Sequence, residues 1–327
     1  MTACLSNEPD GIGRHLSVRV NFLNIKSDNR SSSAAGTLYT LVAFAMWGVL
    51  PGYWKQLQSV PALEIIFHRI VWSFLVSAFL VLLAGKKDVF LDIIRNRKQR
   101  YTVYFTSLAI AINWLIYVYA INAGMIIETS LGYYINPLMS VFFGMVILKE
   151  RLTPLQMVAL FLASCGVLYI TWDFGVFPWL AILLAVSFAL YGLFKKMAGL
   201  DSVASLTAET MFLSLFAFPI LLYRGFSGTG AMGSGSLYVD LFLSGAGIVS
   251  AVPLYLFASG AKAIPLSRVG FIQYVSPTLS LIIGIVIYGE KFTRTHCVSF
   301  GLIWTALALY TVSGFIDRKS DAVSKKN

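Results

Sequence analysis

Glu64, His68 and Arg69 lie close together within one apolar stretch of the chain. Glu64 and His68 are four positions apart and so share one face of a helix, from which Arg69 is turned by about 100°. Such a group could bind an anion through Arg69 and exchange a proton through His68, because histidine titrates near neutral pH. Alternatively, Arg69 could pair with a carboxylate that holds helices together. Both interpretations stay open, and Arg69 is the stronger candidate because it lies about two turns into the stretch.

Two further carboxylates fall inside apolar stretches. Glu128 lies one turn into its stretch, and its partner could be Arg69 or His68. Glu209 lies about two turns into another stretch, deep enough to bind and release a proton if it is desolvated. A hydrogen bond at a helix interface is an equally open interpretation of Glu209. A charge at the centre of a bilayer costs roughly 2.5 to 3.5 kcal/mol, so retained charges usually face the interior of a helix bundle.

The remaining candidates for ligand contact are amides and aromatic rings in the bodies of apolar stretches. Such side chains can orient an amphipathic ligand through hydrogen bonds and stacking. Asn and Gln also join membrane helices, at about 0.6 kcal/mol each, and that alternative stays open. The candidates are Trp47, Asn113, Trp114, Tyr133, Asn136, Tyr191, Gln273 and Tyr274.

The composition places the elements that carry these residues in a lipid bilayer. Hydrophobic residues make up 57% of the chain, charged residues 12%, and the mean hydropathy is +0.76. A soluble domain contains about one quarter charged residues. The net charge of +10 would otherwise suggest nucleic acid as a partner. In a membrane protein, Lys and Arg instead accumulate in cytoplasmic loops, so the charge indicates orientation and we predict no nucleic-acid partner.

Ten apolar runs are long enough to cross about 30 Å of hydrocarbon as helices of some twenty residues. The polar residues 1–36 are predicted to form a disordered cytoplasmic tail, and residues 317–327 a second cytoplasmic tail. The predicted fold is therefore all-α with ten transmembrane helices. They lie at 37–54, 62–84, 101–120, 125–148, 154–172, 176–194, 203–223, 237–261, 267–288 and 295–316.

The distribution of positive charge tests this number of spans independently. Alternate loops should be rich and poor in Lys and Arg if the spans are correct. Of the 25 such residues, 19 lie in segments assigned to one side, four lie on the other side, and Arg69 and Arg268 lie within spans. The richer side includes both tails and the segment 85–100. Both termini are therefore predicted to be cytoplasmic.

One sequence motif occurs twice, 140 positions apart. The segment Tyr134-Ile-Asn-Pro137 recurs as Tyr274-Val-Ser-Pro277, and each is followed by a charged closure that begins at Glu150 or Glu290. Pro137 and Pro277 free backbone carbonyls and allow a kink, so they are candidates for gating. The closures are expected at opposite membrane faces, where they would fix the ends of helices.

Ten spans with a duplication give two units of five spans, residues 37–172 and 173–316. A unit with an odd number of spans must enter the membrane in the opposite direction the second time. Inverted five-helix repeats are typical of secondary transporters, whose binding site lies between the repeats near the midplane of the bilayer. The sequence thus predicts a permease for a small organic solute that works by alternating access.

The sequence also resembles the RarD, or chloramphenicol-sensitive, branch of the EamA-type permeases in the drug/metabolite transporter superfamily. The resemblance implies a ten-helix carrier with two EamA domains in the bacterial inner (plasma) membrane, and it implies export. The segment before residue 37 departs from the family pattern. The matching stretches are Trp47-Gly48 with Pro51, His68-Arg69 with Trp72-Ser73, Asn113-Trp114, Glu128 with Ser130 to Pro137, Ser187 to Lys196, Glu209 to Met211, Gly247 to Pro253, and Gly270 to Thr278.

Other kinds of site find little support in the sequence. No phosphate-binding GxxxxGK[ST] loop is present, so we expect no ATP drive from this chain. No HExxH motif occurs, and the spacing of Cys and His predicts neither a metal site, a cofactor, nor a disulfide framework. Proton coupling through Glu209, Glu128 or His68 is a hypothesis. An intramembrane enzyme and a polytopic receptor are the alternatives, and the chain lacks an evident buried nucleophile for the first and a signalling domain for the second.

Overall fold

The computed structural model describes the backbone of residues 11–323 apart from residues 124, 176 and 290. The side chains of residues 11–31, 121–122, 126–128, 315 and 317–323 also lie outside the described part. Throughout the described residues the chain forms helices and no strands, so the predicted all-α class is confirmed. The helices are α1 (Gly11–Trp54), η1 (Lys55–Leu57), α2 (Ala62–Leu83), α3 (Lys87–Arg95), α4 (Arg97–Asn122), α5 (Ile126–Val146), α6 (Pro154–Asp173), α7 (Trp179–Ala198), α8 (Ser202–Phe226), α9 (Leu237–Ala263), α10 (Leu266–Gln273), α11 (Val275–Val286) and α12 (Arg294–Val323).

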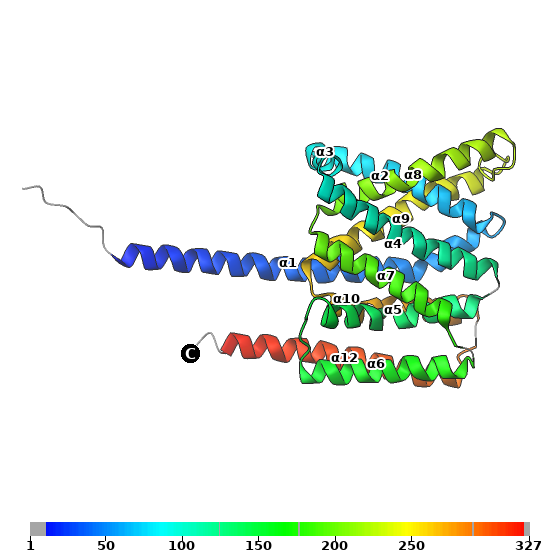
Figure 1. Ribbon diagram of the computed structural model, residues 1–327. Coiled ribbons are helices and arrows are strands. Elements are labelled where there is room, and N and C mark those ends of the chain that lie inside the picture. The colour runs from blue at the N-terminus through cyan, green and yellow to red at the C-terminus, as the bar shows by residue number, and fades with distance from the viewer. Residues whose placement is uncertain (1–10, 124, 176, 290, 324–327) are drawn as a thin grey trace, which may run out of the picture.

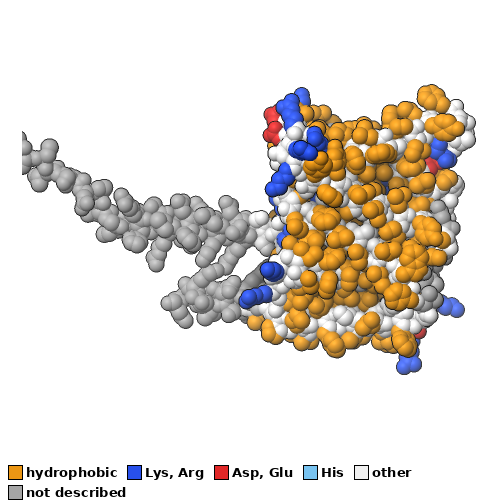
Figure 2. Space-filling view, viewed as in Figure 1, with side chains coloured by type: hydrophobic (Ala, Val, Ile, Leu, Met, Phe, Trp, Pro, Cys, Tyr) orange, Lys and Arg blue, Asp and Glu red, His pale blue; other side chains and the backbone are white. Residues whose placement is uncertain are grey.

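Nine stretches of described residues are long and apolar enough to cross a membrane. They correspond to nine of the ten predicted spans, and the tenth prediction falls on α5, whose first turn includes side chains outside the described part. Hydrophobic side chains cover the middle of the molecule, whereas Lys and Arg gather towards its two ends (Figure 2). The structure is therefore that of a multi-pass membrane protein.

The long helices lie side by side along one direction (Figure 1). One flank contains α2, α8 and α9, the opposite flank contains the pair α6 and α12, and α1, α5, α7 and α10 lie between them. The beginning of α1 and the end of α12 project from the same end of the bundle. Helical backbone begins at Gly11, whereas we expected a disordered tail up to residue 36. Residues 11–36 contain no proline, which would interrupt a helix that continues backwards from the first span.

The two repeated prolines have different backbones around them. Pro137 lies inside the continuous helix α5, whereas a break at Tyr274 separates α10 from α11 just before Pro277. Proline cannot donate a hydrogen bond to the residue four positions earlier, which for Pro277 is Gln273, the last residue of α10. A kink was expected at both prolines, whereas the helix is interrupted only near Pro277. Their gating role stays a prediction.

The carboxylate of Glu150 holds the beginning of α10. Its two oxygens accept hydrogen bonds from the backbone N–H groups of Leu266, at 2.7 Å, and Ser267, at 2.8 Å. Helix N-termini carry unsatisfied N–H groups and a partial positive charge, so a carboxylate stabilises them. We expected Glu150 to cap the end of its own span, whereas its carboxylate holds the beginning of a different helix, α10. Its repeat counterpart, Glu290, lies outside the described residues.

Helix α3 is a short amphipathic element between α2 and α4. Its Ile93 is buried in a small core with Val103 and Ala204, at the same end as the beginning of α8. Beside it, Lys86 Nζ lies 2.6 Å from Asp201 Oδ2. Asp201 is also the N-cap of α8, because its Oδ1 accepts hydrogen bonds from two backbone N–H groups of the first turn.

Asp201 should make part of the stability depend on pH. Burial raises the pKa of its carboxyl, but hydrogen bonds from Lys86 and the backbone of Ala204 and Val203 outweigh burial and leave the pKa below its usual value. The resulting stabilisation is complete above the pKa of the unfolded chain, about 3.9, and is lost as pH falls through the folded pKa. Asp201→Ala should cost about 1 kcal/mol near neutral pH. Thermal unfolding of both proteins should show this difference shrinking below about pH 4, and a constant difference would contradict the assignment.

Candidate functional site

A buried ion pair joins α7 and α8. Lys195 Nζ lies 2.7 Å from Glu209 Oε1, and both side chains are almost completely buried. Glu209 Oε1 also accepts a hydrogen bond from Thr106 of α4, and Oε2 accepts one from the hydroxyl of Tyr191 at 3.3 Å. Lys195 donates a further hydrogen bond to Ser205. The two charges therefore neutralise each other inside a shell of hydroxyl groups, which is what buried charges require.

A small polar pocket lies against this ion pair. Its free volume is about 10 Å³, enough for about one water molecule. Its lining includes Thr102 and Thr106 of α4 together with Lys195, Ser205 and Glu209. The carboxylate of Glu209 therefore borders a space of about the size of one water molecule.

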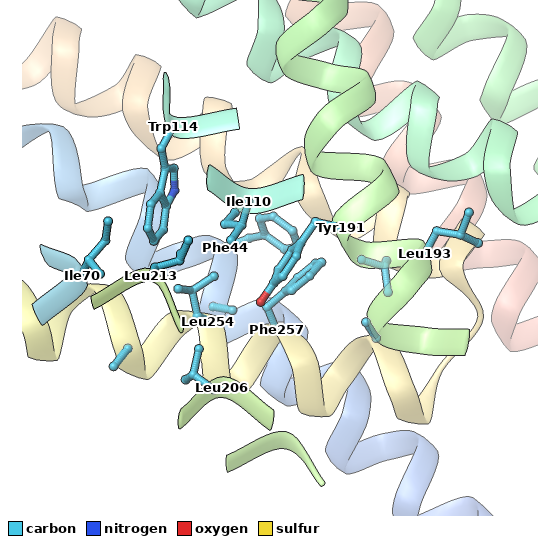
Figure 3. Packing of buried hydrophobic residues seen from close by; sticks show 14 of the residues in the cluster. Phe44, Ile70, Ile110, Trp114, Tyr191, Leu193, Leu206, Leu213, Leu254 and Phe257 are labelled. Atoms are coloured by element: carbon cyan, nitrogen blue, oxygen red, sulfur yellow. The ribbon is translucent and has the colours of Figure 1, made fainter. Parts of the chain in front are cut away.

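Aromatic rings form the apolar side of this region. Tyr191 stacks on Phe257 with ring centroids 6.0 Å apart, and Phe44 meets Phe257 edge to face at 5.8 Å. Figure 3 shows Tyr191 and Phe257 side by side with Phe44 beside them. The indole of Trp47 packs on the same rings, 5.7 Å from Phe257. Trp47 and Tyr191, both predicted site residues, thus meet within one aromatic cluster.

Arg69 forms a second polar group, nearer the beginning of α2. Its guanidinium carbon lies 4.8 Å from the ring centroid of Trp54 and 4.9 Å from that of Trp114, distances at which cation–π attraction operates. Its Nε donates a hydrogen bond to Ser250 Oγ of α9 at 3.0 Å. The hydroxyls of Tyr117 and Tyr133 lie next to each other and within electrostatic range of the guanidinium. The structure therefore brings together three predicted residues, Arg69, Trp114 and Tyr133.

Glu64 and His68 do not join Arg69. Glu64 Oε2 lies 2.9 Å from Arg224 Nη2, and Glu64 Oε1 accepts a hydrogen bond from the backbone N–H of Ala231. His68 Nε2 is 4.0 Å from Glu64 Oε1. Glu64 therefore ties the beginning of α2 to the end of α8 and to the loop before α9. This geometry favours a structural role for Glu64.

The predicted amides divide into two kinds. Asn113 Nδ2 donates to the carbonyl oxygen of Leu184 and to Ser187 Oγ, both at 2.9 Å, and so joins α4 to α7. By contrast, Gln273 is 3% exposed and its amide atoms have no hydrogen-bond partner among the described residues. The buried Tyr274 hydroxyl and the oxygen of Asn136 are likewise without one in that part of the chain. The side chain of Glu128, although on α5, lies outside the described residues.

Several residues that complete these groups were missed by sequence reasoning. Lys195 directly follows the predicted span 176–194, although its spacing of four from Tyr191 places both on one helix face. That spacing was the available signal. Thr106 and Ser250 gave no local signal, because a hydroxyl in an apolar helix usually bonds to its own backbone. Trp54 lies at the end of α1, where a tryptophan is ordinarily interpreted as part of the aromatic belt.

The two polar groups lie at different depths of the bundle. Lys86 follows α2 and pairs with Asp201, which precedes α8, so the end of α2 lies beside the beginning of α8. The hydroxyls of Ser77 and Thr210 are 3.2 Å apart, which places Glu209 level with Ser77. Arg69 is eight residues earlier on α2, or about 12 Å along the helix axis.

Comparison with known proteins identifies the family of this fold. A model of the EamA-like transporter family matches residues 34–172 and again residues 177–312. An uncharacterized transporter of Bacillus subtilis, YojE, is 43% identical over 85% of this chain and 94% of its own length. Protein RarD of Escherichia coli K12 is 37% identical over 87% of this chain and 96% of its own.

A solved structure shares the fold. It is titled "Crystal structure of protein", and it superposes with a TM-score of 0.68 over 85% of this chain and 98% of its own, at 18% sequence identity. At that identity the likeness concerns the fold alone. The family model covers most of the chain, and the relatives match over nearly their full lengths. The chain belongs to the EamA-like transporter family, within its RarD branch, and is a multi-pass membrane protein of the transporter class.

Proposed function

We propose that this protein is a secondary-active transporter that moves a small organic solute across the bacterial inner membrane. The observation that carries the proposal is that both polar groups are shared between the two segments matched by the family model. Arg69 of the first segment bonds to Ser250 of the second, and Glu209 of the second accepts a bond from Thr106 of the first. Interfaces between domains that move relative to one another are more polar than permanent ones, so these two polar contacts favour relative motion of the halves.

An apolar layer between the two polar groups supports alternating access. Thr106, Ile110 and Trp114 follow one another at intervals of four on α4, so they share a face. Thr106 contacts the Glu209 group and Trp114 the Arg69 group, while the buried Ile110 lies between them in the aromatic core with Phe44 and Tyr191 (Figure 3). A solute would pass from one group to the other only when the halves separate along this layer.

The arrangement of the helices supports the proposed topology. An even number of spans leaves both termini on one side, and the beginning of α1 and the end of α12 lie at the same end of the bundle (Figure 1). The two matched segments are consistent with two units of five spans each. Because five is an odd number, the second unit would enter the membrane in the opposite direction to the first. The basic segment around α3 lies at this end too. We therefore assign it to the cytoplasm, following the excess of Lys and Arg on that side.

Glu209 is the proposed site of proton coupling. As a carboxylate it holds Lys195, Thr106 and Tyr191 in one cluster. A proton on Glu209 would remove the ion pair with Lys195 and loosen the contact between α7 and α8. Binding of a proton would thus favour a different arrangement of the halves. Export is the direction that the resemblance to the family implies.

Transport driven by a pH gradient tests the proposal. Purified protein in proteoliposomes should move a solute, first identified by its stabilisation of the folded protein, faster when a pH gradient is imposed. Glu209→Gln should still bind that solute but should lose the response to the gradient, because the side chain can no longer change charge. Wild-type flux that ignores the gradient would remove proton coupling. Absence of any flux would overturn the transporter assignment itself.

A further inference from the structure

The guanidinium of Arg69 is a cation without a counter-ion in the described part of the chain. The described ion pairs involve Glu64 with His68 and Arg224, Glu209 with Lys195, and the surface residue Asp201. None of these carboxylates contacts Arg69. A charge inside the bilayer is retained at a cost of roughly 2.5 to 3.5 kcal/mol, and it usually marks a path for a solute or an ion.

The contacts of Arg69 leave one edge of its guanidinium available. Trp54 and Trp114 contact the group as cation–π partners, and Nε is bonded to Ser250. Among the described residues, the terminal nitrogens Nη1 and Nη2 form no hydrogen bond. These two nitrogens present parallel N–H groups whose spacing matches the two oxygens of a carboxylate.

The surroundings of this edge are aromatic and partly open. Arg69 itself is only partly buried, and the side chain of Tyr133 is 51% exposed. Tyr117 lies beside Tyr133 and adds a hydroxyl near the cation. A ligand that reached Arg69 would therefore place its charged end on the guanidinium and an apolar body against aromatic rings, which favour flat groups.

The positive charge of Arg69 determines which charge a bound ligand should carry. The Trp54 and Trp114 rings, which could otherwise attract a cationic ligand, are already in contact with the guanidinium. A cationic ligand would meet Arg69 as a like charge, which disfavours binding. No described carboxylate contacts Arg69, so one negative charge on a ligand would balance its charge. The site therefore suits a monoanion better than a dianion such as a phosphate ester.

We propose that Arg69 binds the carboxylate of a small organic monoanion whose aromatic body lies against Trp54, Trp114 and Tyr133. This ligand is the substrate class of the proposed transporter, so the inference rests on the proposed function. Ser250 is a positioning residue, because its bond to Nε fixes the orientation of the guanidinium plane.

Binding of three matched probes to the detergent-purified, full-length protein tests the proposal. Benzoate carries a carboxylate, benzamide has nearly the same shape without charge, and benzylamine carries a positive charge. Benzoate at millimolar concentrations should raise the temperature of unfolding, and the increase should grow with its concentration. Benzamide and benzylamine should have little effect. Equal stabilisation by benzoate and benzamide, preference for benzylamine, or no stabilisation by benzoate would each overturn the proposal.

Variants locate the binding to Arg69. Arg69→Gln should weaken benzoate binding roughly ten- to hundredfold, the value of charge-assisted hydrogen bonds. Arg69→Lys should fold, keep the charge and bind at an intermediate level, because it loses the two parallel donors. Arg268→Gln is the matched control, since Arg268 also lies in a span but bonds to Ser33, and it should leave benzoate binding unchanged. Retention of benzoate binding in both Arg69 variants would overturn the assignment.

Three outcomes separate the competing explanations. If Arg69→Glu with Glu128→Arg restores the thermal stability lost in each single variant, then Glu128 neutralises Arg69 and the proposal is wrong. If the protein transports another solute in proteoliposomes but does not bind benzoate, the proposed function stands and the inference about its substrate fails. If the protein binds benzoate through Arg69 but transports no solute, the proposed function fails, whereas Arg69 remains a binding site for a carboxylate.

Discussion

Replacing Lys195 by methionine is expected to destabilise the folded protein by about 3 to 5 kcal/mol. The substitution removes a cation from a nearly completely buried ion pair and leaves the carboxylate of Glu209 uncompensated. Thr106 and Tyr191 can still donate hydrogen bonds to that carboxylate but supply no charge. The expected loss is a lower temperature of unfolding for the detergent-purified protein, measured side by side with the wild type.

The double variant Lys195→Met with Glu209→Met is the informative comparison. Two apolar side chains of similar size remove both charges together, so most of the stability should return. Lys262→Met is the control, because Lys262 is an exposed lysine near the same end of the bundle and, among the described residues, donates its hydrogen bond to the backbone of Leu200. It should unfold within a degree or so of the wild type, since surface substitutions change stability little. A double variant as unstable as Lys195→Met would show that the charges do not act as a pair.

The second large effect is expected from Gly247→Ala. A Cβ atom built on Gly247 of α9 would lie 2.5 Å from the backbone carbonyl carbon and from the Cβ atom of Trp72 of α2. No side-chain rotation can relieve a contact with backbone, so the two helices would have to separate. We expect a loss of roughly 1 to 3 kcal/mol or more, as for other overpacked interfaces. The measurement is again thermal unfolding.

Gly301→Ala is the matched control for this substitution. Gly301 lies within α12, and a Cβ atom there would meet nothing within 4 Å. Alanine has the higher helix propensity by about 1 kcal/mol, so the control should be neutral or slightly stabilising. Equal losses in the two variants would mean that the effect comes from glycine itself rather than from the contact between α2 and α9. Close approach through small residues is the expected way for membrane helices to pack.

Local sequence features predicted the elements of the fold well. The lengths of the apolar runs predicted nine stretches that the structure contains as long helices, because hydrophobicity over some twenty residues reflects the bilayer directly. The recognition of the RarD branch was also correct. Glu150 was expected to cap its own span, but it holds the beginning of α10 instead. The two correct inferences depend on residues that are near one another in sequence or on the family pattern as a whole, whereas the partner of Glu150 is 116 positions away.

Partners across the bundle could not be predicted in this way. Glu64 contacts Arg224, and Arg69 contacts Ser250, because helices from different halves lie side by side. Helical periodicity tells which residues share a face but does not tell which face of another helix they meet. Glu64 was therefore grouped with Arg69 on proximity along the chain, and the structure assigns it to a different contact.

The backbone around the two repeated prolines could not be predicted from the local sequence either. Pro137 and Pro277 occupy equivalent positions of the repeated motif, yet only Pro277 is preceded by an interruption of the helix. A proline frees a carbonyl group, and whether the helix bends or continues depends on the neighbours that satisfy that carbonyl. Those neighbours come from other helices, so equal local sequences have unequal structures.

The contact between Glu150 and the beginning of α10 also bears on the order in which the molecule is assembled. Glu150 belongs to the part of the chain that is synthesised first, and Leu266 and Ser267 to the part that is synthesised later. Domains generally fold as units from the N-terminus during synthesis. When α10 enters the membrane, the carboxylate that satisfies its first N–H groups is therefore already in place. The two hydrogen bonds form only when the beginning of α10 lies against Glu150, so they fix the register of the later half against the earlier one.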